Sequence, residues 1–162
     1  MIRMAFMTDK NYVIGDSTPK GNEARFKQLP PLLTEAMREL YDTDNIAVGA
    51  ASLGQMIRAR KNRYVLTENP EYKAPEGFEN ILICRDFREL VDLYEESPEE
   101  LLIAGGRSVF LQFLPYASIL DVAEADKPVP GDLVFDQWKK EPFKAKSSKR
   151  WEGFNTTRYI RF

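Results

Sequence analysis

The chain has 162 residues, of which 43% are hydrophobic, and a formal net charge of -2. This length fits one domain with its own core, which we expect over residues 1–162. The balanced charge excludes a strongly basic surface, and the apolar runs are too short to cross a bilayer. We expect a monomer that binds neither nucleic acid nor membrane and, without a leader segment, stays in the cytoplasm.

Cysteine and histidine usage narrows the possible chemistry. Cys84 is the only cysteine, which excludes an internal disulfide, and its place at the end of an apolar run predicts a small buried side chain. The absence of histidine excludes histidine-based catalysis and the usual zinc sites, so we expect no metal. Any acid or base must be Asp, Glu, Tyr, Lys or bound water.

The first forty residues predict two strands, a loop and a helix. Apolar runs predict strands over residues 2–7 and 12–15. Residues 16–28 are polar and contain proline and glycine, which predicts a mobile loop that includes a helical turn at residues 23–27. Pro30 and Pro31 open a predicted helix whose apolar residues recur at helical spacing up to Leu40.

The middle of the chain predicts alternating strands and helices. Strands are expected over residues 46–49, 64–67 and 80–83, with a helix from Ala50 to Ile57 after the first of them. Residues 86–89 have the form of a capping box and predict the start of another helix. The sequence also contains a basic cluster of Arg58, Arg60, Lys61 and Arg63. This cluster predicts either a solvated loop or a dock for a carboxylate or phosphate group.

The stretch from Leu101 to Phe110 has the most informative pattern. An apolar run with the length of a buried strand leads directly into Gly105 and Gly106, and an apolar-periodic segment follows. This pattern predicts a strand, a tight turn and a helix start. Glycines at such a turn let the backbone approach a ligand, and a helix start favours an anionic group such as phosphate. The alternative is a turn that only connects two elements.

The last third of the chain predicts strands alone. They are expected over residues 119–125, 133–135 and 156–162, separated by a proline-rich turn and a Lys/Ser-rich loop at residues 144–150. Because strands and helices alternate before this point, the sequence predicts an α/β fold with a mainly parallel sheet and an antiparallel ending.

Several motifs together resemble the dihydrofolate reductase family from end to end. They are Val-Ile-Gly at 13–15, Ile-Ala-Val-Gly at 46–49, Tyr-Val-Leu-Thr at 64–67, Glu-Leu-Leu-Ile-Ala-Gly-Gly at 100–106, Gln-Phe-Leu-Pro at 112–115 and Gly-Asp-Leu-Val-Phe at 131–135. The resemblance implies a three-layer α/β/α fold with an eight-stranded sheet, parallel except for its last strand, and four helices. It also implies hydride transfer from NADPH to dihydrofolate or a related pterin in tetrahydrofolate biosynthesis, a part of one-carbon metabolism.

The resemblance also implies a set of site residues. Gly105 and Gly106 correspond to a cis glycine pair in the family. The residues that it implies for cofactor binding are Ile14, Gly15, Gly49, Ser52, Thr67, Gly105, Gly106, Arg107, Ser108 and Val109. Among them, Ile14 and Gly15 would flank the nicotinamide, and residues 107–109 would bind the pyrophosphate. Substrate contacts are implied for Ala5 and Leu40, and for Arg60 or Lys61 in place of the arginine that binds the glutamate tail.

The chain departs from the family pattern at the catalytic acid. One alignment places that position at Asn22, and the other, which we prefer, places it at or beside Ala36. Glu35 is the adjacent carboxylate and our candidate catalytic residue, although one residue is about 100° around a helix, which favours a solvated charge. The alternative is a carboxylate from the loop at residues 16–28, either Asp16 or Glu23. The family threonine beside the acid corresponds to Ala123.

The phosphate clamp is also altered. The family arginine that binds the cofactor's 2′-phosphate falls at Ala50, so the group that distinguishes NADPH from NADH is missing. Three functions therefore stay open: an active reductase, a protein that binds nucleotide or pterin without turnover, and a structural partner protein.

Overall fold

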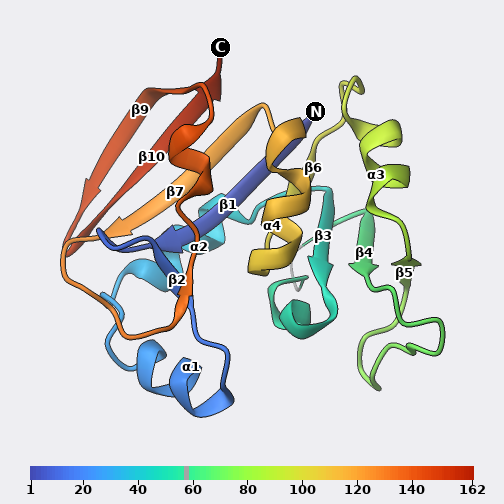
Figure 1. Cartoon of the computed structure of the whole chain (residues 1–162), viewed down its shortest axis with the longest axis horizontal. Helices are drawn as coiled ribbons and strands as arrows, with labels where there is room; N and C mark the ends of the chain where they lie inside the picture. The colour runs from blue at the N-terminus through green and yellow to red at the C-terminus, as the bar shows by residue number, and fades with distance from the viewer. Residues whose placement is uncertain (57–58) are drawn as a thin grey trace. The chain divides into compact units, whose positions relative to one another are not determined.

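The computed structural model describes residues 1–56 and 59–162 (Figure 1). Its elements, in chain order, are β1 (Ile2–Thr8), β2 (Val13–Gly15), α1 (Pro19–Phe26), α2 (Leu33–Leu40), β3 (Asn45–Gly49), η1 (Ala50–Met56), β4 (Asn62–Leu66), β5 (Ile81–Cys84), α3 (Phe87–Tyr94), β6 (Leu101–Ile103), α4 (Arg107–Phe113), η2 (Leu114–Tyr116), β7 (Ile119–Ala125), β8 (Leu133–Val134), η3 (Gln137–Lys140), β9 (Phe143–Trp151) and β10 (Phe154–Arg161). Within these described ranges, every helix is too short or too polar to span a membrane.

Eight of the strands form one sheet in the order β5-β4-β3-β6-β1-β7-β10-β9. Strand β4 is parallel to its neighbours β3 and β5, and β6 is parallel to its neighbours β3 and β1. Strand β10 is antiparallel to both of its neighbours. The predicted α/β class, with a mainly parallel sheet and an antiparallel ending, is therefore confirmed.

The chain divides into two compact units. The first unit contains Met1–Met4 and Tyr41–Ser118, and the second contains Ala5–Leu40 and Ile119–Phe162. The expectation of one domain stays a prediction. In the first unit, the residues of β6 and the central residues of β3 are almost completely buried. Such continuous apolar runs are typical of parallel strands that are covered on both faces.

Helix α3 of the first unit begins where the capping pattern predicts. The side chain of Asp86 accepts a hydrogen bond of 3.0 Å from the backbone N–H of Arg88, which satisfies one of the free donors at the helix start. Leu90, Val91 and Tyr94 are buried on one face. The predicted helix and its apolar face are confirmed.

The second unit has an apolar cluster where α2 contacts the sheet. Its buried members are Leu33 and Ala36 of α2, Ala123 of β7 and Phe154 of β10. Partly buried hydrophobic residues surround them, namely Met7, Leu29, Met37, Leu40 and Trp151. The helical spacing of apolar residues therefore correctly predicts which face of α2 is buried.

The mobile loop predicted over residues 16–28 is wrong for most of its length, because Pro19–Phe26 form α1, of which the sequence predicted only a helical turn at residues 23–27. Thr18 is the N-cap residue, and its hydroxyl accepts a 3.0 Å hydrogen bond from the N–H of Gly21. Pro19 takes the first helical position, where its missing N–H costs nothing. The helix was missed because it lacks an apolar face, and Arg25 is its one buried residue.

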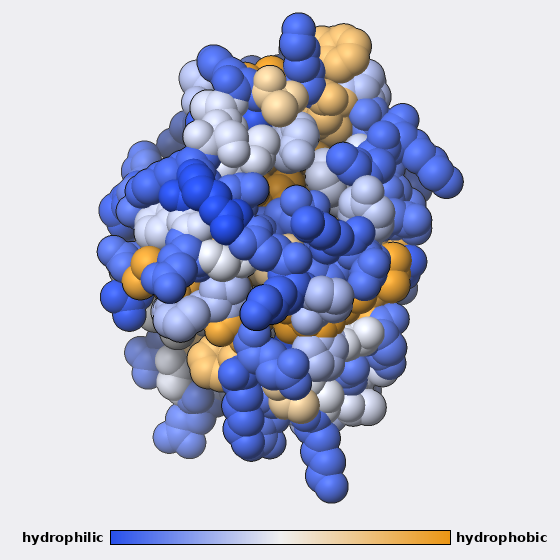
Figure 2. Space-filling view, turned by 90° about the vertical axis from the view of Figure 1, so that its left-hand side faces the viewer, coloured by the Kyte–Doolittle hydropathy of each residue, from blue (hydrophilic) through white to orange (hydrophobic). Residues whose placement is uncertain are grey.

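The loop predicted over residues 144–150 is also wrong, because these residues lie within β9. Strand β9 is the last strand in the order and pairs with β10, and most of its side chains are exposed. Lysine-rich sequences are common on edge strands, where they oppose pairing with other chains. Figure 2, which faces this side of the molecule, shows mainly hydrophilic residues with small separate hydrophobic groups.

Two further elements differ in detail from the prediction. The helix expected from Ala50 is a 3-10 helix ending at Met56, with non-helical backbone angles at Ser52, and Ile57 lies outside the described residues. The strand expected over residues 133–135 is shorter. It pairs with β2 in a separate two-stranded sheet.

Candidate functional site

The strand order of the sheet identifies the carboxyl ends of two central strands as a candidate ligand site. Strands β3 and β6 are parallel neighbours, but the chain leaves them in opposite directions along the strand order, β3 toward β4 and β6 toward β7. In open α/β sheets, ligands bind at the carboxyl ends of strands at such a switch point. The residues that follow β3 and β6 are therefore the first candidates, and both segments belong to the first unit.

Glycines bring these two segments close together. The N–H of Gly49 donates a 2.8 Å hydrogen bond to the carbonyl oxygen of Gly105. A Cβ atom at Gly49 would lie 3.2 Å from Cγ2 of Val109, and one at Gly106 would lie 3.5 Å from Oγ of Ser52. The structure thus places these five predicted cofactor-binding residues beside one another. We call this group the glycine corner.

The backbone of the glycine corner has the conformation that the resemblance implied. The peptide bond between Gly105 and Gly106 is cis, and Gly105 has a φ of 133°, in the region that favours glycine. The first hydrogen bond of α4 joins the N–H of Phe110 to the carbonyl oxygen of Gly106 at 2.9 Å. The N–H groups of Ser108 and Val109 precede this bond and are not used within the helix.

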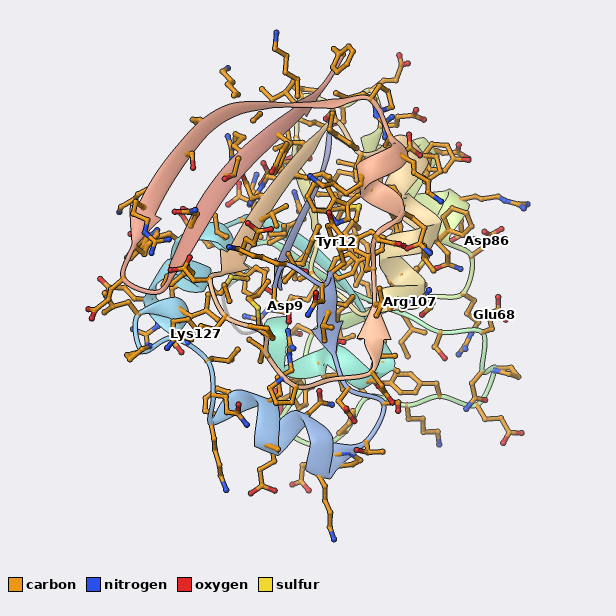
Figure 3. All side chains as sticks on the ribbon, turned by 60° about the vertical axis from the view of Figure 1, so that its left-hand side comes forward. Asp9, Tyr12, Glu68, Asp86, Arg107 and Lys127 are labelled. Atoms are coloured by element: carbon orange, nitrogen blue, oxygen red, sulfur yellow. The ribbon has the colours of Figure 1, made fainter. Side chains whose placement is uncertain are left out.

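The glycine corner fits a phosphate group of a dinucleotide. Its glycines carry no Cβ atom that would obstruct a ligand, and α4 contributes backbone donors at its start, where Figure 3 labels Arg107. Ser108 is exposed, whereas Val109 is buried. The hydroxyl oxygen of Ser52 lies 3.5 Å from the position that a Cβ atom at Gly106 would take.

Thr67, another predicted cofactor residue, directly follows β4, the strand next to β3. Its N–H donates to the carbonyl oxygen of Cys84 at 3.0 Å, and its hydroxyl accepts from the N–H of Asn69 at 3.2 Å. Cys84 is buried as predicted, and this burial raises the pKa of its thiol. Thr67 is therefore held by backbone hydrogen bonds at the same edge of the sheet as the glycine corner.

Arg60 and Lys61 of the basic cluster directly precede β4, and Arg63 lies on its second residue, at the amino end of the parallel strands. Nε of Arg60 is 2.8 Å from Oδ1 of Asp44, and the guanidinium also contacts Asp42. Nζ of Lys61 is 3.2 Å from Oε1 of Glu99. These pairs lower the pKa of Asp44, mainly through its hydrogen bond with Arg60. A substrate carboxylate would have to compete with these acidic residues, and Arg58 lies outside the described residues.

In the second unit, Ile14 and Gly15 lie on β2, beside the segment at 131–133. Strand β2 pairs with β8, and Gly15 is opposite Leu133. A Cβ atom at Gly131 would lie 2.4 Å from the carbonyl oxygen of Gly15, so this close approach requires glycine. The carboxylate of Asp132 accepts hydrogen bonds from the N–H and hydroxyl of Ser17, at 2.8 and 2.5 Å, which lower its pKa.

A buried carboxylate, which sequence reasoning missed, supports the same segment. Asp9 is 0% exposed, and its Oδ1 accepts from the N–H groups of Asn11 at 2.9 Å and Val13 at 3.1 Å. Its Oδ2 accepts from the N–H of Val129 at 2.8 Å. Figure 3 labels Asp9 and Tyr12 on the connection between β1 and β2. The only signal in the sequence was an Asp at a turn directly after a strand.

A buried arginine was missed as well. Arg25 of α1 is 5% exposed, although it lies in a segment that the sequence predicts as a polar loop with one helical turn. Its guanidinium donates to the carbonyl oxygens of Val13 and Pro130, both at 3.1 Å, and to the sulfur of Met7 at 3.5 Å. Burial lowers the pKa of Arg25, and the charge of Asp9 opposes this effect. Nothing in the sequence distinguishes it from an exposed helix arginine.

The residues around the predicted acid position are apolar. Ala36 is 1% exposed, whereas Glu35 is exposed on the other side of α2. Ala123, at the position of the family threonine, is 0% exposed in the same cluster as Ala36. At the alternative position, the side chain of Asn22 forms two hydrogen bonds with the backbone of Asp16, at 2.8 and 2.9 Å. Neither alignment places a carboxylate at the acid position.

The two remaining substrate candidates, Ala5 and Leu40, both belong to the second unit. Ala5, on β1, is completely buried, and Leu40, at the end of α2, is half-buried against the cluster. The second unit therefore brings Leu40 together with Ala36 and Ala123. It places Glu35 apart from them.

Comparisons with known proteins bear on the family and the fold of this chain. A family model described as dihydrofolate reductase matches residues 46–160. A solved structure of dihydrofolate reductase from Enterococcus faecalis, complexed with NADP(H) and RAB-propyl, matches with a TM-score of 0.78 and 20% identity. The match covers 99% of this chain and 96% of that one. At this identity the structural match shows the fold alone.

One curated relative also matches in sequence. It is named "Putative arsenical pump-driving ATPase 1", from Aquifex aeolicus, and is 22% identical over 126 residues. The match covers 75% of this chain, but the chain spans only 31% of the length of that relative.

Proposed function

Because the chain belongs to the dihydrofolate reductase family, we propose that it transfers a hydride from NADPH to dihydrofolate or a related pterin. The proposal includes a role in tetrahydrofolate biosynthesis, as a monomer in the cytoplasm. The solved structure with the same fold contains NADP(H), which supports a nicotinamide cofactor for this chain.

The observation that carries the proposal is the glycine corner. The 2.8 Å hydrogen bond from Gly49 to Gly105 holds the ends of β3 and β6 together at the switch point of the sheet. There the residues that we assign to the cofactor's phosphates are Gly105, Gly106, Ser108 and Val109, with the Ser52 hydroxyl beside them. Ile14 and Gly15, held by the pairing of β2 with β8, are assigned to the nicotinamide.

The cofactor supplies the hydride, and the protein must bind and orient the reactants and provide a proton. The family uses a buried carboxylate for that proton, but Ala36 and Ala123 occupy the corresponding positions here. We therefore propose bound water as the proton donor. Glu35 is the alternative, and its exposed position on α2 requires that the substrate approach that side of the helix.

A titration followed by an activity measurement tests the proposal. The protein is titrated with NADPH and separately with NADH, and dihydrofolate is then added while the absorbance of the reduced nicotinamide is followed. Binding followed by oxidation supports the reductase. If neither nucleotide binds, both the cofactor assignment and the reductase proposal are wrong.

A second candidate function is binding without catalysis. The specific observation in its favour is the apolar cluster at Ala36 and Ala123, because a pocket without an acid loses the usual route of proton delivery. In the same experiment, nucleotide binding without oxidation would favour this candidate. Titration with folate would then show whether the pterin is bound as well.

A further inference from the structure

We propose that Arg25 is a positioning residue that fixes the backbone of Ile14 and Gly15 for the nicotinamide end of the cofactor. The inference rests on the proposed function for the identity of the ligand. It goes beyond that function because it assigns a role to a buried side chain of α1, which none of the predicted site residues belongs to.

The guanidinium of Arg25 joins two segments that are far apart in sequence. One nitrogen donates to the carbonyl oxygen of Pro130, and another donates to the carbonyl oxygen of Val13, each at 3.1 Å. Val13 immediately precedes Ile14 on β2, and Pro130 immediately precedes Gly131. Both backbone acceptors are therefore adjacent to the place where Gly131 approaches the carbonyl oxygen of Gly15.

The surroundings of Arg25 explain why a guanidinium suits this position. It has five N–H donors in a fixed planar arrangement, so one side chain reaches both carbonyl groups and the sulfur of Met7. A buried charge is costly unless it is paired and hydrogen-bonded. The negative charge of Asp9, which is also buried, acts on Arg25 within the same unit. Asp9 in turn accepts from the N–H groups of Val13 and Val129.

Asp9 and Arg25 thus bind the same two segments through opposite backbone groups. The carboxylate accepts from N–H groups of residues 13 and 129, and the guanidinium donates to carbonyl groups of residues 13 and 130. Loss of the guanidinium would leave two backbone acceptors without their donor and would remove a positive charge that acts on the buried carboxylate of Asp9, each at a cost in free energy. We expect β2 and the segment at 129–133 to separate more often as a result.

Arg25→Met and Arg25→Lys are compared with Arg38→Met, a matched control on the exposed side of α2. The first measurement is hydrogen–deuterium exchange in the whole protein. Arg25→Met is expected to increase the exchange rate about tenfold in residues 13–27 and 129–135 and to leave the exchange rates in β9 and β10 unchanged. Arg25→Lys should recover part of the protection, and Arg38→Met should match the wild type. Unchanged exchange in both segments would overturn the proposal.

The second measurement separates positioning from general destabilisation. Dissociation constants are measured for two pairs of ligands that differ only in the nicotinamide, namely NADPH with 2′-phospho-ADP-ribose and NADH with ADP-ribose. Of NADPH and NADH, the one that binds the wild type more tightly should bind Arg25→Met about tenfold more weakly, which is 1.4 kcal/mol. The dissociation constant of the matching ligand without nicotinamide should change less than about twofold. Equal weakening of both members of a pair would overturn the positioning role.

The two proposals fail in different ways. If the wild-type protein binds none of the four ligands, the proposed function is wrong, whereas the exchange measurement still tests whether Arg25 holds the two segments. If Arg25→Met does not fold, the comparison of Arg25→Lys with the wild type replaces it. Lysine keeps the charge but cannot reach both carbonyl groups with a planar fork, so it should still weaken dinucleotide binding selectively.

Discussion

Ala36 of α2 and Ala123 of β7 belong to one apolar cluster, in which both side chains are almost completely buried. In the family, an acid and a threonine occupy the positions that we match to these residues. Their joint replacement is physically coherent, because a single buried polar group without its partner would be costly, whereas two apolar groups can be nearly neutral. The same coherence makes the pair a good place to test the proposed function.

Restoring the acid alone should destabilise the protein. Ala36→Asp places a carboxylate among buried apolar side chains, and we expect the free energy of unfolding to fall by about 3 kcal/mol or more. Adding Ala123→Thr should recover about 1 kcal/mol, because the hydroxyl can donate to the carboxylate. Urea unfolding of the single and double variants measures both effects, with Thr34→Asp on the exposed side of α2 as the control. An unchanged midpoint for Ala36→Asp would mean that this side chain reaches water.

Removing the charge of Glu35 tests the identity of the proton donor. If water supplies the proton, Glu35→Gln should change the rate of dihydrofolate reduction less than about twofold and should leave its pH profile unchanged. A proton-donating carboxylate would instead cost about 100-fold in rate. Glu39→Gln, also exposed on α2, is the matched control. A 100-fold loss confined to Glu35→Gln would identify Glu35 as the acid.

Introducing an arginine after β3 should change the preference between the two cofactors. Ala50 directly follows Gly49 of the glycine corner, at the position of the family's phosphate clamp. Ala50→Arg should strengthen NADPH binding about tenfold, since a guanidinium binds phosphate through charge-assisted hydrogen bonds, and should leave NADH binding nearly unchanged. The control is Ala51→Arg at the exposed next position. An equal gain for NADPH and NADH would argue against a specific 2′-phosphate contact.

The stability of the first unit should depend on pH in the alkaline range. The hydroxyl groups of Tyr64 and Tyr94 are 2.8 Å apart, and burial raises the pKa of Tyr94 well above its usual value. The pKa of Tyr94 in the folded protein therefore exceeds its unfolded value of about 10. The contribution of the neutral Tyr94 hydroxyl to stability is fully present below pH ~10 and is lost as the pH rises further. Tyr94→Phe should cost about 1 kcal/mol at neutral pH and reduce the alkaline loss.

Unfolding of this variant in urea at a series of pH values between neutral and strongly alkaline measures the effect. Tyr116→Phe, which alters an exposed tyrosine in the same unit, is the control and should retain the wild-type pH dependence. The prediction fails if the two variants lose stability in parallel above pH ~10.

Local sequence patterns predicted two kinds of element, namely helices with one apolar face and strands that are buried on both faces. The run from Leu101 to Ile103 and the two glycines that follow could be interpreted directly, because burial requires a continuous apolar run and the corner requires residues without a Cβ. The spacing of Leu33 and Ala36 likewise identified the buried face of α2. Composition failed for β9 and α1, since an edge strand and a polar surface helix need no apolar pattern.

The sequence by itself determined the α/β class, the turn at Gly105 and Gly106 and the absence of a carboxylate at the matched acid position, because each follows from residue types at fixed spacing. Only the tertiary structure decided that Arg25 is buried beside Val13 and Pro130 and that Arg60 is paired with Asp44. A charged side chain is read from sequence as solvated. Whether it is buried or paired depends on groups more than ten residues away, which the fold brings to it through backbone carbonyls and carboxylates that carry no local sequence signal.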